Sequence, residues 1–569
     1  MAKIKYQDLR HSAAHLLASA VKELFPKVKL GIGPSIEHGF YYDFDIKTPF
    51  TEQDIEKIEK KMFEIVKKDF EFKKSKKTRK EAQKILKNEP YKLELLKDLP
   101  DNNITFYTHG NFTDLCLGPH IKSTGQLKAV KLLKFSGSYW KGDSQNKQLQ
   151  RIYGVAFPST KELRQYLKQL EEAEKRNHVK LGKQLDLFSI HPEGPGFTFW
   201  HPKGVIIYNE IIKYWEEEHK KVNYLQVKTP IILSKELWLK SGHWDHYKES
   251  MYFTKIDKRD FAIKPMNCPG GILIYKEKLH SYKEFPLRIA ELGLVHRHEL
   301  SGVLNGLFRV RVFTQDDAHI YCEENQIEQE VLNILELTER IYKKFNFKFH
   351  IELSTMPEKH IGQEKTWQKA EKHLENALKK KKVDYRINPG DGAFYGPKID
   401  FHLEDALGRT WQCGTIQLDF SMPEKFNLTY DAENGKKQRP VMLHRTILGS
   451  MERFIGMLIE HYAGNFPLWL SPVQVRIVTV TDRNNKFAQQ IYKKLTEKDI
   501  RVELDDRSES IGKKVREAQL MKIPLVITIG DKEQQKKTLA VRTVDGKVKF
   551  GVKIETFIKD IVKKISERK

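Results

Sequence analysis

A chain of 569 residues is too long for one domain, so its length predicts several. Hydrophobic residues make up 39% of the chain and charged residues 31%, a balance that is typical of folded proteins and excludes a mainly disordered one. The formal net charge of +24 favours a partner that carries phosphates, either a nucleic acid or an anionic membrane surface.

The cysteines and the N-terminus indicate the compartment. Cys116, Cys268, Cys322 and Cys413 are too few and too widely spaced for the disulfide framework of a secreted scaffold. The N-terminus has no apolar segment leading to a cleavage site, and no apolar run has the length of a membrane span. We therefore expect a cytoplasmic protein that makes no membrane contact.

The first two predicted segments are residues 1–158 and 159–183. An amphipathic helix pattern starts at Tyr6, a strand-like run (GFYYDFD) follows, and a highly charged helical segment extends from Thr51 to about Lys87, which together predict an α+β domain. Residues 159–183 are charged, lack proline and start with Ser-Thr, a pattern that predicts a solvated linker helix.

Two further domains are predicted after the linker. Residues 184–470 mix strands and helices over a length sufficient for a large antiparallel sheet with flanking helices. Residues 471–569 alternate strands and helices in the order βαβαβ, which predicts a small mixed sheet covered by helices. The fold class is thus multidomain α/β (α+β).

Three stretches of the middle domain occur in the order of the signature motifs of class II aminoacyl-tRNA synthetases. Residues 222–247 resemble motif 1 around Pro230, residues 287–322 resemble the strand–loop–strand of motif 2, and residues 441–460 resemble the strand and helix of motif 3. The resemblance implies a class II antiparallel catalytic core and a homodimer that forms through motif 1.

Amino-acid activation brings a carboxylate against the α-phosphate of ATP, so fixed cations must neutralise the charge that develops there. Arginine suits this task because its planar fork holds phosphate oxygens and keeps its proton. The resemblance places Arg297 near the α-phosphate and Arg453 near the γ-phosphate, with Mg²⁺ bridging the phosphates. It also implies Glu299, Arg309, Gln412 and Thr415 as ATP-binding residues and Lys398 as a catalytic residue.

Cys268, His319 and His444 form a Cys-His-His set that would leave one position of a tetrahedral zinc ion open for substrate. In the threonyl-tRNA synthetases, which this chain resembles over essentially its whole length, one zinc per subunit at these positions binds the amino group and hydroxyl of threonine. Such a site rejects valine, which lacks the hydroxyl. The resemblance adds Asp317, Tyr395, Gln315 and Met266 as threonine-binding residues.

His243 matches a histidine that, in this family, helps to activate the terminal ribose of tRNA. A neutral imidazole near the 2′-hydroxyl could accept its proton at physiological pH. The alternative is a histidine that only makes a hydrogen bond at the dimer interface.

A second cluster is predicted in the first domain. His11 and His15, spaced i, i+4, share one helix face, and Cys116 and His120 could complete a metal site, so chemistry alone predicts a metal. The resemblance instead implies metal-free hydrolysis of mischarged seryl-tRNA(Thr), with Asp114 included, because serine carries the hydroxyl that the zinc selects. The third reading is buried histidines of an amphipathic helix.

The last domain resembles the anticodon-binding domain of class II synthetases. Glu533 and Arg542 match positions that contact anticodon bases, and Ser508 replaces the more usual asparagine; a solvated charged face is the alternative. We also expect the small ubiquitin-like domain that often begins full-length relatives to be absent. Gly271, His298 and Leu300 depart from the family pattern without changing a proposed ligand.

The sequence therefore predicts an enzyme of the threonyl-tRNA synthetase family that binds ATP, L-threonine and tRNA(Thr), charges the tRNA at its 3′ end, and hydrolyses seryl-tRNA(Thr). Two alternatives stay open. A synthetase-like RNA-binding protein without catalysis is expected to lose Arg297, Arg453 or the zinc set. A prolyl or seryl synthetase shares the three motifs and lacks the Cys268, His319 and His444 combination.

Overall fold

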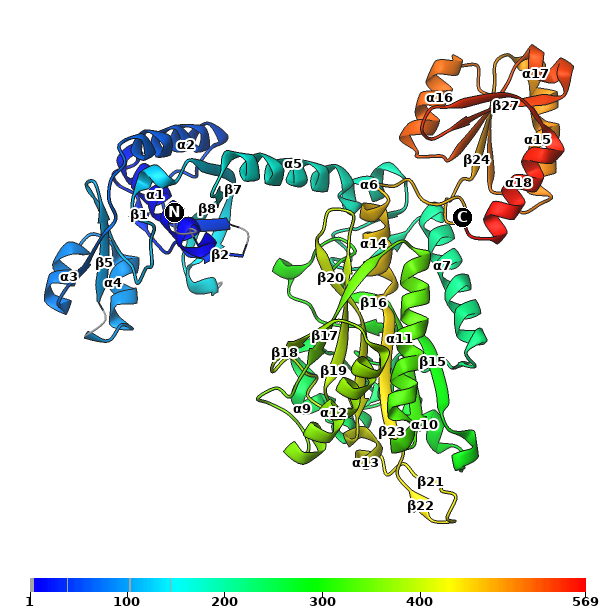
Figure 1. The fold of residues 1–569 in the computed structure, drawn as a ribbon, viewed down its shortest axis with the longest axis horizontal. Helices are drawn as coiled ribbons and strands as arrows, with labels where there is room; N and C mark the ends of the chain where they lie inside the picture. The colour runs from blue at the N-terminus through cyan, green and yellow to red at the C-terminus, as the bar shows by residue number, and fades with distance from the viewer. Residues whose placement is uncertain (1–4, 38, 102–103, 144) are drawn as a thin grey trace. The chain divides into compact units, whose positions relative to one another are not determined.

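A computed structural model describes the chain except for residues 1–4, 38, 102–103 and 144. The chain divides into two compact units, residues 1–171 and 172–569 (Figure 1). None of the helices in the described part of the chain combines the length and the apolar character needed to span a membrane.

The first unit is built around helix α1 (Tyr6–Leu24), which packs on a five-stranded sheet. The helix buries Leu9, Ala13 and Leu16, which recur at the spacing of one helix face. The predicted helix and the predicted strand are both confirmed. The sheet has the order β1-β3-β8-β7, with β2 paired to β3, and consists of β1 (Lys29–Leu30), β2 (Ser35–Ile36), β3 (Gly39–Asp45), β7 (Ala129–Tyr139) and β8 (Gln148–Phe157).

The predicted continuous helical segment from Thr51 to Lys87 is wrong. Helix α2 (Glu52–Lys67) is capped by Thr51 and ends before Asp69, which has a left-handed backbone (φ 48°). The chain then forms β4 (Lys73–Lys76), because its backbone groups pair with β5 rather than within a helix. A small sheet β4-β5-β6 and two further helices complete the unit: β5 (Thr105–His109), β6 (Phe112–Leu115), α3 (Arg79–Ile85) and α4 (Pro90–Lys97).

The predicted linker helix is two helices. Helix α5 (Thr160–Arg176) buries no residue, and the Ser159 hydroxyl accepts the Glu162 N–H at 3.2 Å, as the Ser-Thr start predicts. The helix ends at Asn177, whose side-chain oxygen accepts two backbone N–H groups and starts α6 (His178–Gln184). Helix α6 buries Leu181, so the second half of the linker is part of a packed core.

The middle of the second unit is an eight-stranded sheet of order β11-β15-β16-β23-β20-β19-β17-β18 (Figure 1). Neighbouring strands are antiparallel except for the outermost pairs, β11/β15 and β17/β18, so the predicted antiparallel core is confirmed. The strands are β11 (Leu225–Gln226), β15 (Leu287–His296), β16 (Val312–Cys322), β17 (Lys348–Ser354), β18 (Tyr385–Asn388), β19 (Lys398–Glu404), β20 (Thr410–Asp419) and β23 (Val441–Ser450).

Helices and a smaller sheet surround these strands. The main helices are α7 (Pro202–Lys221), α11 (Ile327–Lys344), α12 (Glu364–Lys381) and α14 (Met451–His461), which share one apolar core with the sheet. The smaller sheet, β12-β14-β13, lies in the segment that resembles motif 1 and the residues after it. It consists of β12 (Ile232–Ser234), β13 (Tyr252–Ile256) and β14 (Arg259–Ile263), with α8 (Lys235–Ser241), α9 (His243–Tyr247) and α10 (Cys268–Lys276) next to it in the chain.

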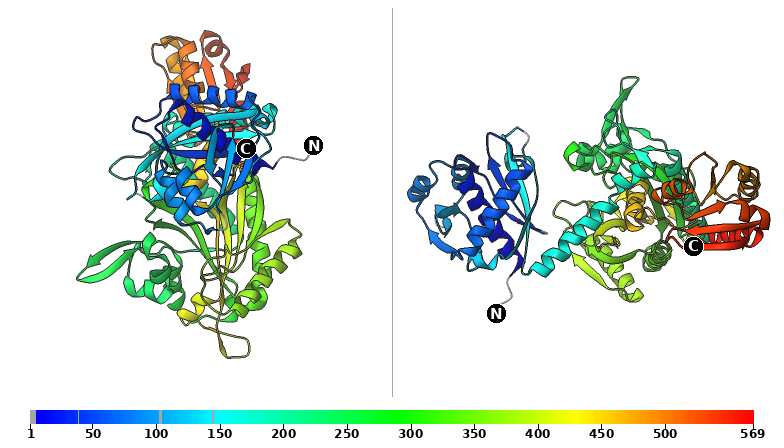
Figure 2. Two further views of the ribbon diagram at one scale, coloured as in Figure 1. Left: turned by 90° about the vertical axis from the view of Figure 1, so that its left-hand side faces the viewer. Right: turned by 90° about the horizontal axis from the view of Figure 1, so that it is seen from above.

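The C-terminal sheet has the order β25-β24-β26-β27-β28 and is orange to red in Figure 2. Strands β25, β24 and β26 are parallel and the last two pairings are antiparallel, which confirms the predicted mixed sheet. The elements are β24 (Val475–Thr479), α15 (Asn485–Thr496), β25 (Val502–Asp505), α16 (Ile511–Leu520), β26 (Leu525–Ile529), α17 (Asp531–Lys536), β27 (Thr538–Thr543), β28 (Val548–Lys553) and α18 (Ile554–Ser566).

Candidate functional site

The fold brings Cys268, His319 and His444 together. His319 on β16 and His444 on β23 are directly opposite each other in the antiparallel register, and Cys268 is the first residue of α10. One sulfur or nitrogen atom from each of the three lies within 4.8 Å of the others, and all three residues are buried. Nε2 of His319 is buried and has no hydrogen-bond partner among the described residues.

The electrostatics of this cluster favour a cation. Burial and the neighbouring Asp317 and Asp419 raise the pKa of the Cys268 thiol well above its usual value, and burial lowers the pKa of His319. Neutral imidazole is the form that binds a metal, and a cation would favour the thiolate. One nitrogen of His444 lies 2.9 Å from Asp419 Oδ2, the kind of carboxylate contact that commonly orients a metal-binding histidine.

A cavity of about 300 Å³ adjoins the cluster and contains the residues predicted to bind threonine. Asp317 accepts a hydrogen bond from Asn267 Nδ2 at 3.3 Å, and the hydroxyl of Tyr395 donates to Gln417. Buried polar atoms without a partner among the described residues, Gln315 Oε1 and Thr415 Oγ1, offer unused hydrogen-bonding capacity. The lining includes Met266, Cys268, Arg297, Gln315, Asp317, Tyr395, Thr415 and His444.

The predicted phosphate-binding residues form separate anchored pairs. Arg297 lines the cavity, and its Nε donates to the carbonyl of Pro265 at 3.2 Å. Arg309 pairs with Glu299 at 2.9 Å, and Arg453 donates to the carbonyl of Gln412 at 3.0 Å. Each guanidinium is thus held by protein contacts before any ligand binds.

Lys398 and Gln412 share a carboxylate. Lys398 Nζ lies 2.9 Å from Asp400 and 3.0 Å from Asp391, and Gln412 Nε2 donates to Asp400 at 2.7 Å. Burial opposes the charged form of Lys398, and the two carboxylates outweigh it and raise its pKa. Lys398 is therefore a fixed positive charge.

His243 is completely buried beside the cavity. Its Nδ1 lies 2.8 Å from Ser241 Oγ, and its Nε2 lies 3.0 Å from the sulfur of Met266, which lines the cavity. Burial lowers the pKa of His243 to about 3, so the imidazole is neutral at physiological pH.

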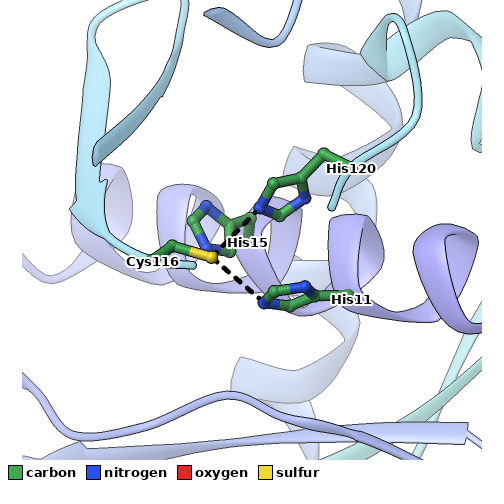
Figure 3. A group of neighbouring side chains, drawn as sticks. All are labelled: His11, His15, Cys116 and His120. Carbon is green, nitrogen blue, oxygen red and sulfur yellow. Dashed lines mark hydrogen bonds between the residues drawn. The ribbon is translucent and has the colours of Figure 1, made fainter. Parts of the chain in front are cut away.

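The second predicted cluster forms in the first unit, where Figure 3 shows its four side chains converging. His11 and His15 are on α1, and Cys116 and His120 follow β6. The Cys116 sulfur lies 3.2 Å from Nε2 of His11 and 3.3 Å from Nε2 of His120. Burial lowers the pKa of the three histidines and raises that of Cys116 to about 11, so all four groups are neutral.

This cluster borders a cavity of about 480 Å³ that also contains Asp114. The carboxylate of Asp114 accepts a hydrogen bond from the Tyr42 hydroxyl at 2.6 Å and pairs with Lys92 at 2.8 Å. Lys92 is buried, which is costly for a lysine without a paired carboxylate. The pair fixes the Asp114 carboxylate at the cavity wall.

Sequence reasoning missed several site residues. Lys92 is one lysine in a lysine-rich helical stretch and carries no distinguishing signal. Asp419 could have been found, because Thr415, Gln417 and Asp419 are polar at alternate positions of one strand and therefore share a face. Other residues that were missed and that contact predicted ones are Asn267, Tyr42 and Gln417.

The three predicted anticodon-binding residues lie on three segments of the C-terminal part. Glu533 is in α17, where its carboxylate accepts the Gly530 N–H at 3.1 Å. Arg542 is on β27 and donates to the carbonyl of Gly546 at 2.9 Å, and Ser508 is exposed between β25 and α16. Glu533 thus has a helix-capping role.

Comparisons with known proteins match three parts of the chain to family models. Residues 252–462 match the "tRNA synthetase class II core domain (G, H, P, S and T)", and residues 474–564 match an "Anticodon binding domain". Residues 104–153 match the "Threonyl and Alanyl tRNA synthetase second additional domain".

Several similar proteins are named threonine–tRNA ligase. The threonine–tRNA ligase of Acetivibrio thermocellus is 57% identical over 98% of this chain and 88% of its own length, and that of Carboxydothermus hydrogenoformans is 58% identical over 98% and 89%. A solved structure titled as the RNA binding domain of threonyl-tRNA synthetase from Cryptosporidium parvum is 40% identical, covers 68% of this chain and 98% of its own, and has a TM-score of 0.66. A putative threonyl-tRNA synthetase from Aeropyrum pernix is 29% identical, covers 69% and 97%, and has a TM-score of 0.61.

Proposed function

The chain belongs to the threonyl-tRNA synthetase family, and on that basis we propose that it activates L-threonine with ATP and Mg²⁺ and transfers the threonyl group to the 3′ end of tRNA(Thr). The observation that carries this proposal is the convergence of Cys268, His319 and His444 at the wall of a cavity that also contains Arg297 and Asp317.

Cys268, His319 and His444 would hold one zinc ion per subunit. Two observations suit such a role. Nε2 of His319 has no hydrogen-bond partner among the described residues and lies 3.7 Å from Asp317, and His444 contacts Asp419. When bound, zinc would supply a Lewis acid for the amino group and the hydroxyl of threonine, and valine lacks the second of these two ligands. Asp317 binds the amino group, and Tyr395, Gln315 and Met266 surround the side chain.

Fixed charges would bind the ATP. Arg297 neutralises the α-phosphate during attack by the threonine carboxylate, Arg453 and Arg309 bind the outer phosphates, and Lys398 adds a positive charge. Glu299 orients Arg309 through their ion pair. Gln412 and Thr415 contribute hydrogen bonds to ATP.

His243 would take part in transfer to the tRNA. Its neutral imidazole can accept a proton, and it touches Met266 at the cavity wall. The transfer step therefore needs a small movement of this region to expose the imidazole to the ribose.

The cluster of the first unit would edit serine without a metal. The Cys116 sulfur contacts two imidazoles, those of His11 and His120, at 3.2 and 3.3 Å, whereas the Cys268 sulfur contacts His243 at 3.9 Å. Neutral His11, His15 and His120 can position a water and accept its proton, with Asp114 and Cys116 in the same site. Hydrolysis of seryl-tRNA(Thr) at this site removes serine that was attached in error. The proposed zinc site cannot prevent that error, because serine also has a hydroxyl group.

The other parts of the chain would serve tRNA binding and assembly. We assign residues 1–158 to editing, 159–183 to the linker, 184–470 to catalysis and 471–569 to the anticodon, with Glu533, Arg542 and Ser508 as base contacts. Exposed apolar side chains on β12 and β13 suit a homodimer through the motif 1 region, namely Ile232, Phe253 and Ile256. The four free cysteines of the chain suit a location in the cytoplasm.

Amino-acid-dependent pyrophosphate exchange, measured for each of the twenty amino acids, tests this function. We expect exchange with threonine, weaker exchange with serine and none with valine. Exchange with proline, or with serine in preference to threonine, would identify another synthetase, and exchange with no amino acid would favour an RNA-binding protein without catalysis.

A further inference from the structure

A third group of metal-binding side chains lies outside both predicted sites. His350 and Glu352 are on β17 and His402 is on β19, and one nitrogen or oxygen atom from each lies within 4.8 Å of the others. His350 and His402 are directly opposite in the antiparallel register, and their rings stack at 4.9 Å with an angle of 8° between the planes.

The spacings between the imidazole nitrogens and the carboxylate oxygens are close to those around a bound ion, and the stacked rings would tilt toward each other on binding it. Nε2 of His402 lies 3.4 Å from Glu352 Oε2, and Nε2 of His350 lies 3.7 Å from Glu352 Oε1. Ligand atoms about 2.0 Å from a tetrahedral zinc ion are separated by about 3.3 Å. Both distances exceed the roughly 2.7–3.2 Å of an ordinary N–H···O hydrogen bond, so neither imidazole is tightly bonded to the Glu352 carboxylate.

We propose that His350, Glu352 and His402 bind a divalent transition-metal ion, separate from the Cys268, His319 and His444 site. Two imidazoles and one carboxylate are a ligand set for zinc, nickel, copper or iron, and not for calcium or magnesium, which prefer oxygen ligands. Asn388 Nδ2 donates to Glu352 Oε2 at 3.3 Å and orients the carboxylate from the neighbouring strand β18.

The site occupies the same sheet face as Asp400. Glu352 is opposite Asp400 in the register, and Asp400 is two residues from His402 on β19, so all three side chains point the same way. Asp400 in turn contacts Lys398 and Gln412. A metal here would tie β17 to β19 next to the strand positions that we assign to ATP binding.

Isothermal titration of the full-length protein with Ni²⁺ tests the proposal, with His402→Phe as the main variant. Phenylalanine keeps a ring that stacks on His350 and removes the ligand nitrogen. The control is His373→Phe, because His373 also lies next to carboxylates, and its side chain is 21% exposed against 20% for His402. The Cys268, His319 and His444 set and the cluster of the first unit are unchanged in every variant.

We expect His402→Phe to lose one bound Ni²⁺, or to weaken its binding by at least about tenfold, and His373→Phe to titrate like the unchanged protein. Glu352→Gln, which keeps the size of the side chain, is expected to weaken the same ion. Equal Ni²⁺ binding by the unchanged protein, His402→Phe and Glu352→Gln would overturn the proposal. Circular dichroism spectra that match that of the unchanged protein verify that the variants fold.

Discussion

The proposed zinc ion depends on one sulfur atom, that of Cys268. We expect Cys268→Ala to lose the bound zinc and to lower threonine-dependent pyrophosphate exchange by at least about a hundredfold, because removal of a direct ligand costs more than loss of an outer contact. Metal analysis and the exchange assay measure the two effects. Cys116→Ala, which removes a thiol from the other cluster, is the control and keeps both zinc and exchange. Full exchange in zinc-free Cys268→Ala would refute the role of the metal in threonine selection.

His243 is the single residue on which the proposed transfer step depends. Replacement by alanine is expected to slow single-turnover transfer of threonine from the adenylate to tRNA by about a hundredfold, the size of a lost general base. A transfer rate that is unaffected by His243→Ala would leave the histidine only the packing and hydrogen-bonding role that was its alternative.

Glu452 makes stability depend on pH. Burial raises its pKa to about 8, and its carboxyl group accepts the Thr314 N–H at 2.9 Å. The folded protein therefore keeps a proton that the unfolded chain releases above about pH 4.5, so this contribution to stability falls as the pH rises from about 5 to 8, by at most about 1.4 kcal/mol per pH unit.

Thermal unfolding of Glu452→Gln measures this effect, since glutamine is neutral at every pH. We expect Tm of the unchanged protein minus Tm of Glu452→Gln to decrease from pH 5 to pH 8. A difference that is constant with pH would mean that Glu452 is ionised in the fold.

Residues that belong to a sequence motif could be predicted, and residues that support them from elsewhere could not. Cys268, His319 and His444 were found because each is in a recognisable stretch, and the sheet register then places the two histidines opposite each other. Lys92 was missed, because nothing in the chain indicates that α4 would bury it against Asp114.

The elements show the same division between local and long-range causes. Strand β3 and the order of the C-terminal elements could be predicted, because the alternation of apolar and polar residues and the turn residues that indicate them lie within or beside each element. The helical prediction across residues 68–78 failed because β4 depends on a partner, β5, that begins at Thr105. The break at Asn177 has a local cause, its side-chain cap, whereas the burial of α6 in the apolar core of the second unit is a tertiary effect that the chain does not indicate locally.

The prediction on assembly concerns strand β12. Ile232 is 44% exposed, and its replacement by glutamate would place a charge in the proposed dimer interface. We expect light scattering to find two 66.8-kDa chains per particle for the unchanged protein and one for Ile232→Glu. Phe550→Glu, on exposed β28, is the control and is expected to stay dimeric. A dimeric Ile232→Glu protein would place the interface elsewhere.

For the whole molecule, we propose that the cavity at Cys268 and the four-residue cluster of the first unit divide the task of specificity. The first distinguishes threonine from valine by the hydroxyl group, and serine passes that test. The second would therefore act on a product that the first releases, and this chain carries both candidate sites. Its net charge of +24 suits the tRNA that both sites share.

The fate of serine tests this division most directly. The protein is incubated with ATP, tRNA(Thr) and radioactive serine, and seryl-tRNA is compared between the unchanged chain and the double variant His11→Ala, Cys116→Ala, with threonine charging as the control. We predict that both proteins charge threonine equally and that only the double variant accumulates seryl-tRNA(Thr). Rapid deacylation of seryl-tRNA by the double variant would contradict the account.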